Sequence, residues 1–120
     1  MQPCERLTTW RESYDLVIAT YRATDTFPRQ ELCGLTSQAR QAAYSVVANL
    51  VEGSAKRGNR EFRRFLDISI GSIAELSIVF RLARDLGYLS MEAWEKIEDR
   101  RRRSALLVWR LCRSLGDRGR

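Results

Sequence analysis

Apolar residues recur at steps of three and four in four stretches of the sequence, the period of one face of an α-helix. These stretches cover approximately residues 9–24, 36–55, 60–86 and 91–115. The breaks between them are short, and the 120 residues include only 7 Gly and 2 Pro. Short connections join neighbouring helices that run in opposite directions. The pattern therefore predicts one all-α domain, residues 1–120, folded as an antiparallel up-down four-helix bundle.

Local signals predict where these helices begin and end. Thr9, with Glu12 three residues later, has the form of a capping box and predicts a helix start at Thr9. The region of Gly53 and Gly58 is expected to loosen the end of the second helix, and Asn59 is expected to cap the third. Gly87 ends the third helix, and the hydroxyl of Ser90 is expected to cap the fourth.

Each helix is predicted to turn one stripe toward the core. In the first two helices the expected stripes are Leu7, Trp10, Tyr14, Val17 and Tyr21, then Ala39, Ala43, Val46, Val47, Leu50 and Val51. In the third the stripe is Phe62, Phe65, Leu66, Ser69, Ile73, Leu76, Phe80 and Ala83. In the fourth it is Trp94, Ile97, Arg101, Ser104, Ala105, Val108, Leu111, Cys112 and Leu115.

The last two helices carry more apolar residues than one core face needs. The surplus residues chosen as a subunit interface are Ile68, Ile78, Leu82, Leu106 and Trp109. A helix that is apolar nearly all round is buried on more than one face. We therefore expect either an unusually deep core or a homo-oligomer in which these side chains lie between subunits.

Positive charge is concentrated in the second half of the chain. The net charge is +6, with −1 on residues 1–55 and +7 on residues 56–120, and 19 of the 21 basic residues are Arg. The densest cluster is Lys56, Arg57, Arg60, Arg63 and Arg64, at the expected start of the third helix. A helix N-terminus attracts phosphate, so this cluster is the predicted nucleic-acid site. The alternative is a solvated charged turn, and the arginine excess can also reflect genome composition.

Arginine also fills residues 100–103, which lie on the fourth predicted helix. Four successive helical residues span about 300° around the axis, so they cannot all face one ligand. Glu95, Glu98 and Asp99 offset part of this charge. The run is therefore expected to be mostly solvated or part of an interface.

Several polar residues fall within or beside the apolar stripes: Asn49, Glu52, Ser72, Glu75 and Arg101. An unpaired buried charge is costly. We therefore expect a buried polar network in which Arg101 neutralises Glu52, Glu75 or another carboxylate, within its own subunit or a neighbouring one.

The composition argues against catalysis and metal binding. The chain has no His, which removes the commonest general base and the commonest transition-metal ligand. Bundles that bind two metal ions use Glu-x-x-His pairs. Cys4, Cys33 and Cys112 are widely spaced, as expected for reduced thiols in the cytoplasm. We predict no cofactor, no metal and no catalytic residue; no uncharged run is long enough to span a bilayer, and the charged N-terminal segment lacks a signal peptide's apolar core.

A series of short motifs at characteristic spacing runs from about residue 7 to residue 89. They are Leu7 with Trp10, Tyr21, Thr24, Phe27-Pro28, Gly34-Leu35-Thr36, Gln38, Arg40, Ser45, Ala48-Asn49, Glu52-Gly53, Glu61-Phe62, Phe65-Leu66, Gly71-Ser72, Glu75-Leu76 and Leu86-Gly87-Tyr88-Leu89. The series resembles the four-helix bundle protein family, also called the 23S rRNA intervening-sequence protein family. Val47 stands where that family usually has Pro, so the second helix is expected to be straighter here.

The resemblance implies a four-helix bundle that assembles into a ring, commonly a pentamer. Some members of the family are encoded inside inserts in ribosomal RNA genes. The accessory protein of diversity-generating retroelements looks similar in fold, and it works as a basic ring with a reverse transcriptase and nucleic acid. These are analogies, because a fold does not determine a function.

Charge and resemblance together predict a non-enzymatic oligomeric bundle that binds nucleic acid, RNA more than DNA, through arginine–phosphate contacts. Such contacts position a nucleic acid without reading its sequence, so specificity is expected to be low. The alternative is a protein-interaction scaffold whose partner is acidic or itself processes nucleic acid.

Overall fold

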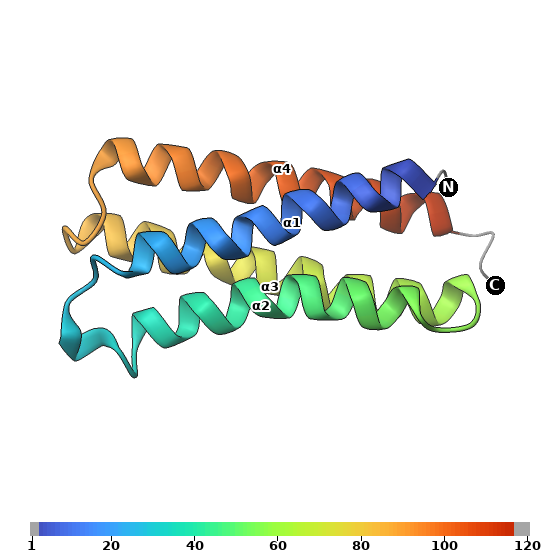
Figure 1. Ribbon diagram of the computed structural model, residues 1–120, viewed down its shortest axis with the longest axis horizontal. Helices are drawn as coiled ribbons and strands as arrows, with labels where there is room; N and C mark the ends of the chain where they lie inside the picture. The colour runs from blue at the N-terminus through green and yellow to red at the C-terminus, as the bar shows by residue number, and fades with distance from the viewer. Residues whose placement is uncertain (1–2, 117–120) are drawn as a thin grey trace.

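The computed structural model describes residues 3–116 and contains four long α-helices in that range (Figure 1). They are α1 (Pro3–Thr24), α2 (Leu35–Ser54), α3 (Asn59–Asp85) and α4 (Met91–Leu115). A short 3-10 helix, η1 (Arg29–Glu31), lies between α1 and α2. The expected bounds of the last three helices are confirmed to within a residue or so, whereas α1 begins six residues before the predicted start at Thr9.

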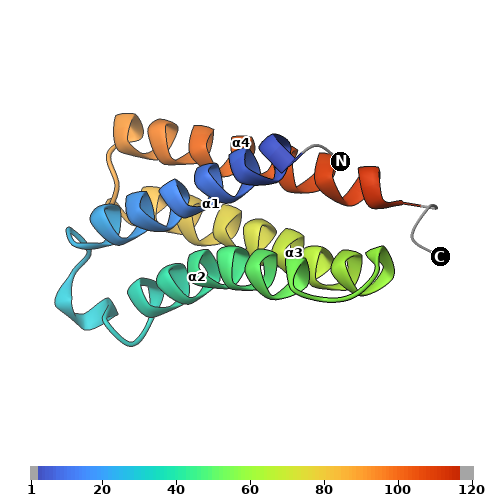
Figure 2. The same cartoon turned by 45° about the vertical axis from the view of Figure 1, so that its right-hand side comes forward.

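The four helices form an elongated bundle with extents of 45 × 25 × 18 Å. The α2–α3 connection lies at the same end as the start of α1 and the end of α4, and the other two connections lie at the opposite end (Figure 1). The main contacts join α1 to α2, α2 to α3, α3 to α4 and α4 back to α1. A second view shows α1 with α4 on one side and α2 with α3 on the other (Figure 2). The α1–α2 face therefore lies opposite the α3–α4 face.

The core consists of two apolar clusters. One is centred on Leu16, Ala43, Leu76 and Phe80, and the other on Val46, Leu66, Ile73 and Val108. The predicted stripes of α2, α3 and α4 supply most of these residues. Within them, Phe65 is only half-buried and Val51 is exposed.

The face that α1 turns to the core differs from the predicted one. Leu7, Trp10, Tyr14 and Tyr21 are exposed, and the buried stripe is Thr9, Ser13, Leu16, Thr20 and Thr24. Three of its hydroxyls donate to the carbonyl four residues earlier: Thr9 to Glu5 at 2.9 Å, Thr20 to Leu16 at 2.7 Å and Thr24 to Thr20 at 2.8 Å. The Ser13 hydroxyl is hydrogen-bonded to that of Ser104 on α4, at 2.8 Å. Since these groups are satisfied, small hydroxyl residues can be buried where the sequence pattern predicted aromatic ones.

The capping box predicted at Thr9 and Glu12 is also wrong. Thr9 lies inside α1, and its hydroxyl bonds backward to the Glu5 carbonyl instead of forward to a free N–H. At the start of α4 the expected cap is confirmed, because the Ser90 hydroxyl accepts from the Ala93 N–H at 3.0 Å. The expected break after α3 is also confirmed, with Gly87 at φ 83°.

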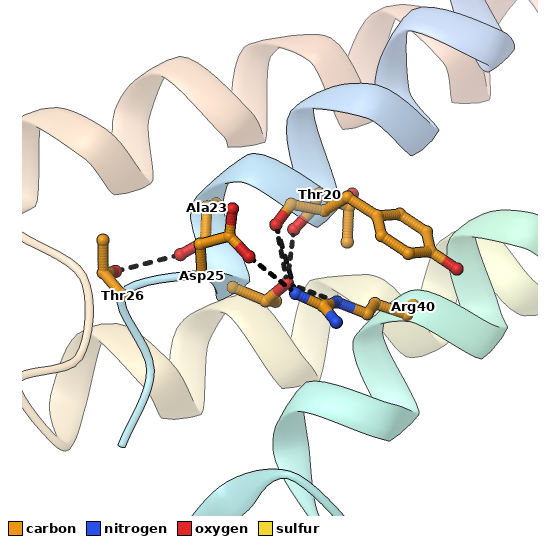
Figure 3. A network of polar contacts seen from close by, with 7 residues as sticks. Thr20, Ala23, Asp25, Thr26 and Arg40 are labelled. Atoms are coloured by element: carbon orange, nitrogen blue, oxygen red, sulfur yellow. Dashed lines mark hydrogen bonds and ion pairs between the residues drawn. The ribbon is translucent and has the colours of Figure 1, made fainter. Parts of the chain in front are cut away.

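A side chain of α2 fastens the end of α1 (Figure 3). Arg40 donates to the Thr24 hydroxyl at 2.9 Å, to Asp25 at 3.0 Å and to the Tyr21 carbonyl at 3.4 Å. Its guanidinium also lies 4.8 Å from the centre of the Tyr21 ring. The last turn of a helix leaves carbonyls without intrahelical partners, so Arg40 completes α1 and holds it against α2.

Gly53 brings α2 and α3 close together. It is buried, and α2 continues through it to end at Ser54, so the break expected in the Gly53 and Gly58 region begins after Gly53. A Cβ at this position would lie 2.8 Å from the Cβ of Phe65 and 2.9 Å from Cδ1 of Phe62. The helix also passes Val47 without interruption.

Replacing the two helical glycines with alanine is expected to have opposite effects. Gly53→Ala should lower the free energy of unfolding by about 1–3 kcal/mol, the usual cost of overpacking. Gly71→Ala, whose Cβ would meet nothing within 4 Å, should raise it by about 0.5–1 kcal/mol through helix propensity. Urea denaturation followed by circular dichroism measures both. Equal effects of the two substitutions would contradict the close approach at Gly53.

Candidate nucleic-acid interface

The α2–α3 connection exposes the beginning of α3. Gly58 occupies the N-cap position with φ 82°, and no side chain caps the first turn. The first residue of the helix is Asn59, and the first backbone bond joins the Phe62 N–H to the Gly58 carbonyl at 3.4 Å. The earlier N–H groups of this turn have no intrahelical acceptor, so they can donate to an anion.

The five predicted nucleic-acid-binding residues surround this turn, but they are not equally available. Lys56, Arg57, Arg60 and Arg64 are exposed, and Arg63 is half-buried. Arg63 donates to the Gly116 carbonyl at 2.5 Å and is thereby held against the end of α4. Sequence proximity had suggested one uniform patch, whereas the structure gives Arg63 a structural role.

Lys56 and Arg64 share an aromatic side chain. Their cationic groups lie 5.3 Å and 4.9 Å from the centre of the Phe65 ring. Arg64 also pairs with Glu61 at 3.2 Å, and this contact lowers the pKa of the Glu61 carboxyl. Glu61 is therefore ionised and offsets part of the local positive charge. Within residues 3–116, Arg57 and Arg60 have neither an ion pair nor a ring contact, so they are the cations most available to a phosphate.

Other helices extend the positive surface at this end of the bundle. Arg6 of α1 lies over the Phe62 ring at 4.9 Å, and Arg113 of α4 lies over Trp109 at 5.0 Å. Arg110 is exposed on the same part of α4. The N-terminus of α1 and the C-terminus of α4 both lie at the end that carries the α2–α3 connection (Figure 1). Sequence reasoning missed Arg6 because it placed the start of the first helix after it.

We call this surface the basic end. It comprises the α2–α3 cluster and its neighbours: Lys56, Arg57, Arg60, Arg63, Arg64, Arg6, Arg110 and Arg113.

The arginine run at residues 100–103 is divided among different partners. Arg101 pairs with Glu98, Arg102 lies 3.5 Å from Glu98, and Arg103 lies 2.8 Å from Glu12 on α1. Arg100 is exposed, with no ion pair in the described part of the chain. As expected, these residues do not form one site.

The predicted buried polar network is only partly assembled. Ser72 donates to the Ser45 hydroxyl at 2.8 Å, and Asn49 donates to the Ser45 carbonyl at 2.8 Å, so these two residues meet between α2 and α3. Glu52 and Glu75 are exposed in the single chain. For the single chain, the prediction that they belong to a buried network is therefore wrong.

Arg101 has a carboxylate partner, as predicted, but the partner is Glu98 on its own helix. The Arg101 Nη2 donates to Glu98 Oε2 at 2.9 Å, and Glu98 is only 4% exposed. The signal was present in the sequence, since Trp94, Glu98 and Arg101 follow one helical stripe. It was overlooked because Glu98 was counted among solvated charges.

The five residues predicted as a subunit interface all lie on the surface of the single chain. Ile68, Ile78, Leu82, Leu106 and Trp109 are exposed, with Ile78 the most exposed at 64%. Beside Leu106 and Trp109, a hollow of about 310 Å³ lies between α3 and α4, lined also by Ile70, Ile73 and Ala105.

A second apolar face covers α1 and α2, and all of it except Tyr44 had been assigned to the core from the sequence. Its exposed residues are Leu7, Trp10, Tyr14, Tyr21, Tyr44 and Val51. Trp10 and Tyr14 stack with ring centres 5.2 Å apart. The chain therefore carries two different apolar faces on opposite sides of the bundle.

The one partly buried thiol in the described range is poorly suited to nucleophilic catalysis. Burial, reinforced by Asp67 3.8 Å away, raises the pKa of the Cys112 thiol. The thiol is therefore protonated near neutral pH, and the thiolate is the reactive form. No group of three His, Cys, Asp or Glu side chains within residues 3–116 is arranged to hold a metal ion. In the same range, no helix is long and apolar enough to cross a membrane.

Comparison with known proteins agrees with this architecture. Residues 5–108 match the model of a family described as 23S rRNA-intervening sequence protein. No curated protein matches the chain.

The Arg101–Glu98 pair should contribute measurably to stability. Arg101→Ala leaves the Glu98 carboxylate buried with only Arg102 nearby, so the free energy of unfolding should fall by about 3 kcal/mol, the lower end for a broken buried pair. The matched change Arg100→Ala removes the same charge from the same helix and should cost less than about 0.5 kcal/mol. Chemical denaturation of both variants tests this. If Arg101→Ala lowers the free energy of unfolding no more than Arg100→Ala does, the buried pair does not stabilise the fold.

Proposed function

Because the chain belongs to the family of 23S rRNA-intervening sequence proteins, we propose that it is a non-enzymatic, oligomeric bundle that binds nucleic acid, RNA in preference to DNA, at its basic end. The family description points to an association with ribosomal RNA. The observation that carries the proposal is the pair of exposed, unpaired guanidinium groups of Arg57 and Arg60 beside the uncapped first turn of α3. The free Cys33 and Cys112 thiols suit the cytoplasm, where we place this activity.

Contacts of this kind would recognise the phosphate backbone. Arginine binds phosphate through two parallel N–H donors, and the free N–H groups of the α3 turn add further donors. Two aromatic rings of the basic end lie under cations, with Phe65 beneath Lys56 and Arg64 and Phe62 beneath Arg6. They are therefore not free to stack on bases, and binding should show little sequence preference.

The two apolar faces support the assembly that we propose. An up-down bundle with antiparallel neighbours would account for the connections at alternating ends and for the α1–α2 face lying opposite the α3–α4 face. A subunit with two different apolar faces on opposite sides makes heterologous contacts, in which one face binds the other face of the next subunit. Such contacts generate a ring when the rotation between neighbouring subunits closes. We propose a closed ring of this kind, and the family resemblance favours a pentamer.

A ring would strengthen binding to a polyanion. Copies related by rotation present the basic end on the same side, and a pentamer multiplies the net charge of +6 five-fold. Several weak phosphate contacts on one strand act together through effective concentration. Weak phosphate binding at each subunit is then sufficient for the ring to hold a nucleic acid.

A protein scaffold is the second candidate, favoured by the exposed and stacked Trp10 and Tyr14 on α1. Aromatic residues are enriched at protein interfaces. The partner would be acidic or itself process nucleic acid. Association with one defined protein that persists after nuclease treatment would favour this candidate.

Mixing two interface variants tests the heterologous contact. Tyr14→Glu alters the α1–α2 face, and Leu106→Glu alters the α3–α4 face. Because each variant loses one side of every contact, each alone should be monomeric by size-exclusion chromatography with light scattering. An equimolar mixture should form a heterodimer, since one intact face of each variant remains complementary. Met91→Glu, an exposed apolar position at the start of α4, should assemble as the unmodified protein does. A monomeric unmodified protein at micromolar concentration would overturn the ring.

Salt dependence tests the basic end. If Arg57 and Arg60 each neutralise one phosphate, Arg57→Ala with Arg60→Ala should flatten the log–log salt slope of single-stranded RNA binding by about 1.4 per engaged subunit. The matched control is Arg22→Ala with Arg29→Ala, which removes two exposed arginines near the opposite end. It should keep the slope. Fluorescence anisotropy across a salt series, with RNA and DNA of one sequence, measures both. No binding at low salt, or equal slopes for the two double variants, would favour the scaffold.

A further inference from the structure

A polar pocket of about 340 Å³ lies between α3 and α4, in the half of the bundle nearer the α3–α4 connection. Helix α3 contributes Ser77, Arg81 and Arg84, and α4 contributes Trp94, Glu98, Arg101 and Arg102. By helical rise, Arg81 is about 30 Å along α3 from Arg60, so the pocket is separate from the basic end.

Helical spacing brings these side chains together. Ser77, Arg81 and Arg84 are four and three residues apart, which places them on one face of α3. Trp94, Glu98 and Arg101 repeat the same spacing on α4. The pocket is therefore formed where one polar stripe of each helix faces the other.

The indole nitrogen of Trp94 is buried without a partner. Trp94 Nε1 is the one buried side-chain nitrogen or oxygen atom within the described residues that has no hydrogen bond. An indole N–H can only donate, and buried donors are almost always paired. The Arg84 guanidinium lies 4.5 Å from the ring centre and limits its movement. Trp94 lines the pocket, so a ligand that brings an acceptor to this wall would supply the missing partner.

The charges around the pocket leave one guanidinium group, that of Arg81, without a carboxylate partner among residues 3–116. Four guanidinium groups surround one carboxylate, Glu98, whose oxygens already accept from Arg101 and lie 3.5 Å from Arg102. Arg84 pairs with Asp85 at 2.9 Å. Arg81 has no ion pair in the part of the chain that the structure describes, and its guanidinium is free to bind.

We propose that this pocket binds a phosphate group. Phosphate offers several acceptor oxygens at once. One could accept from the Trp94 N–H, others from the paired N–H groups of the Arg81 guanidinium, and another from the Ser77 hydroxyl. A pocket of this volume falls within the range of small-molecule sites and exceeds the size of one phosphate. The group therefore belongs to a larger molecule, either a phosphorylated small molecule or a nucleic-acid backbone.

The indole N–H of Trp94 is a direct reporter of the site. In a ¹H–¹⁵N spectrum of the assembled protein, three indole signals are expected, and Trp94→Phe identifies the signal of Trp94. Titration with inorganic phosphate at constant ionic strength should shift this signal saturably, whereas a shift of the Trp109 signal, whose ring lies beneath Arg113, would report phosphate at the basic end. No saturable shift of the Trp94 signal by about 10 mM phosphate, the millimolar limit of useful affinity, would overturn the proposal.

Two variants show whether the named donors hold the phosphate. Arg81→Ala should weaken phosphate binding about ten-fold, the loss expected for one charged hydrogen bond. Arg100→Ala removes the same charge from an exposed position outside the pocket and should leave the affinity unchanged. Trp94→Phe, followed by calorimetry, keeps the ring and should also weaken binding. Equal affinity in Arg81→Ala and Arg100→Ala would overturn the assignment.

The source of the phosphate follows from a third comparison. Adenosine monophosphate and a ten-nucleotide RNA are titrated into the Arg81→Ala and Arg57→Ala/Arg60→Ala proteins. A loss of nucleotide binding in Arg81→Ala alone supports a small phosphorylated ligand. A loss of RNA binding in Arg81→Ala as well supports a backbone phosphate. Failure of the basic end to bind RNA leaves the nucleotide result intact, so the two proposals are tested separately.

Discussion

The inward face of α1 sets the constraint on which the rest of the molecule depends. Thr9, Ser13, Thr20 and Thr24 are buried, and their hydroxyls are satisfied by carbonyls one turn earlier or by Ser104. Because these side chains are small and paired, α1 can pack closely on its neighbours at little polar cost. A helix has only one inward face, so its large residues, including Trp10 and Tyr14, must lie outside. The exposed apolar face on α1 thus follows from the packing of small residues in the interior.

Some arginines hold the fold, whereas others carry no ion pair in the described part of the chain. Arg40 completes the end of α1, Arg63 is bound to the end of α4, and Arg101 neutralises Glu98. Arg57, Arg60 and Arg81 have no ion pair among residues 3–116. The net charge of +6 therefore says less about function than the position of a few unpaired groups.

Sequence periodicity predicted the fold class, the bounds of α2, α3 and α4 and most of their core, because one apolar stripe dominates each of these helices. It failed on α1, where two stripes are present and apolarity does not say which one faces the core. The same ambiguity affected Glu98: a carboxylate near an arginine run looks solvated until the fold shows that it is buried. Ile68, Ile78 and Leu106 were recognised because they exceeded what one core needs. Arg81 and Trp94 were not grouped, since their proximity depends on how α3 and α4 pack.

The proposed pocket and the α3–α4 apolar face occupy one continuous groove. On α3, Ile70, Ser77, Arg81 and Arg84 follow one strip, and on α4 the strip through Arg101 continues to Ala105 and Trp109. If a neighbouring subunit covers the apolar part of this groove, it also lies beside the basic part. A phosphate bound there would then meet a different environment in the ring and in the free chain, and any difference in its affinity between the two would couple binding to assembly. Linkage is reciprocal, and the factor by which assembly changes phosphate affinity is the factor by which phosphate changes assembly. Self-association at the apolar part and phosphate binding at the basic part would thus be two coupled equilibria.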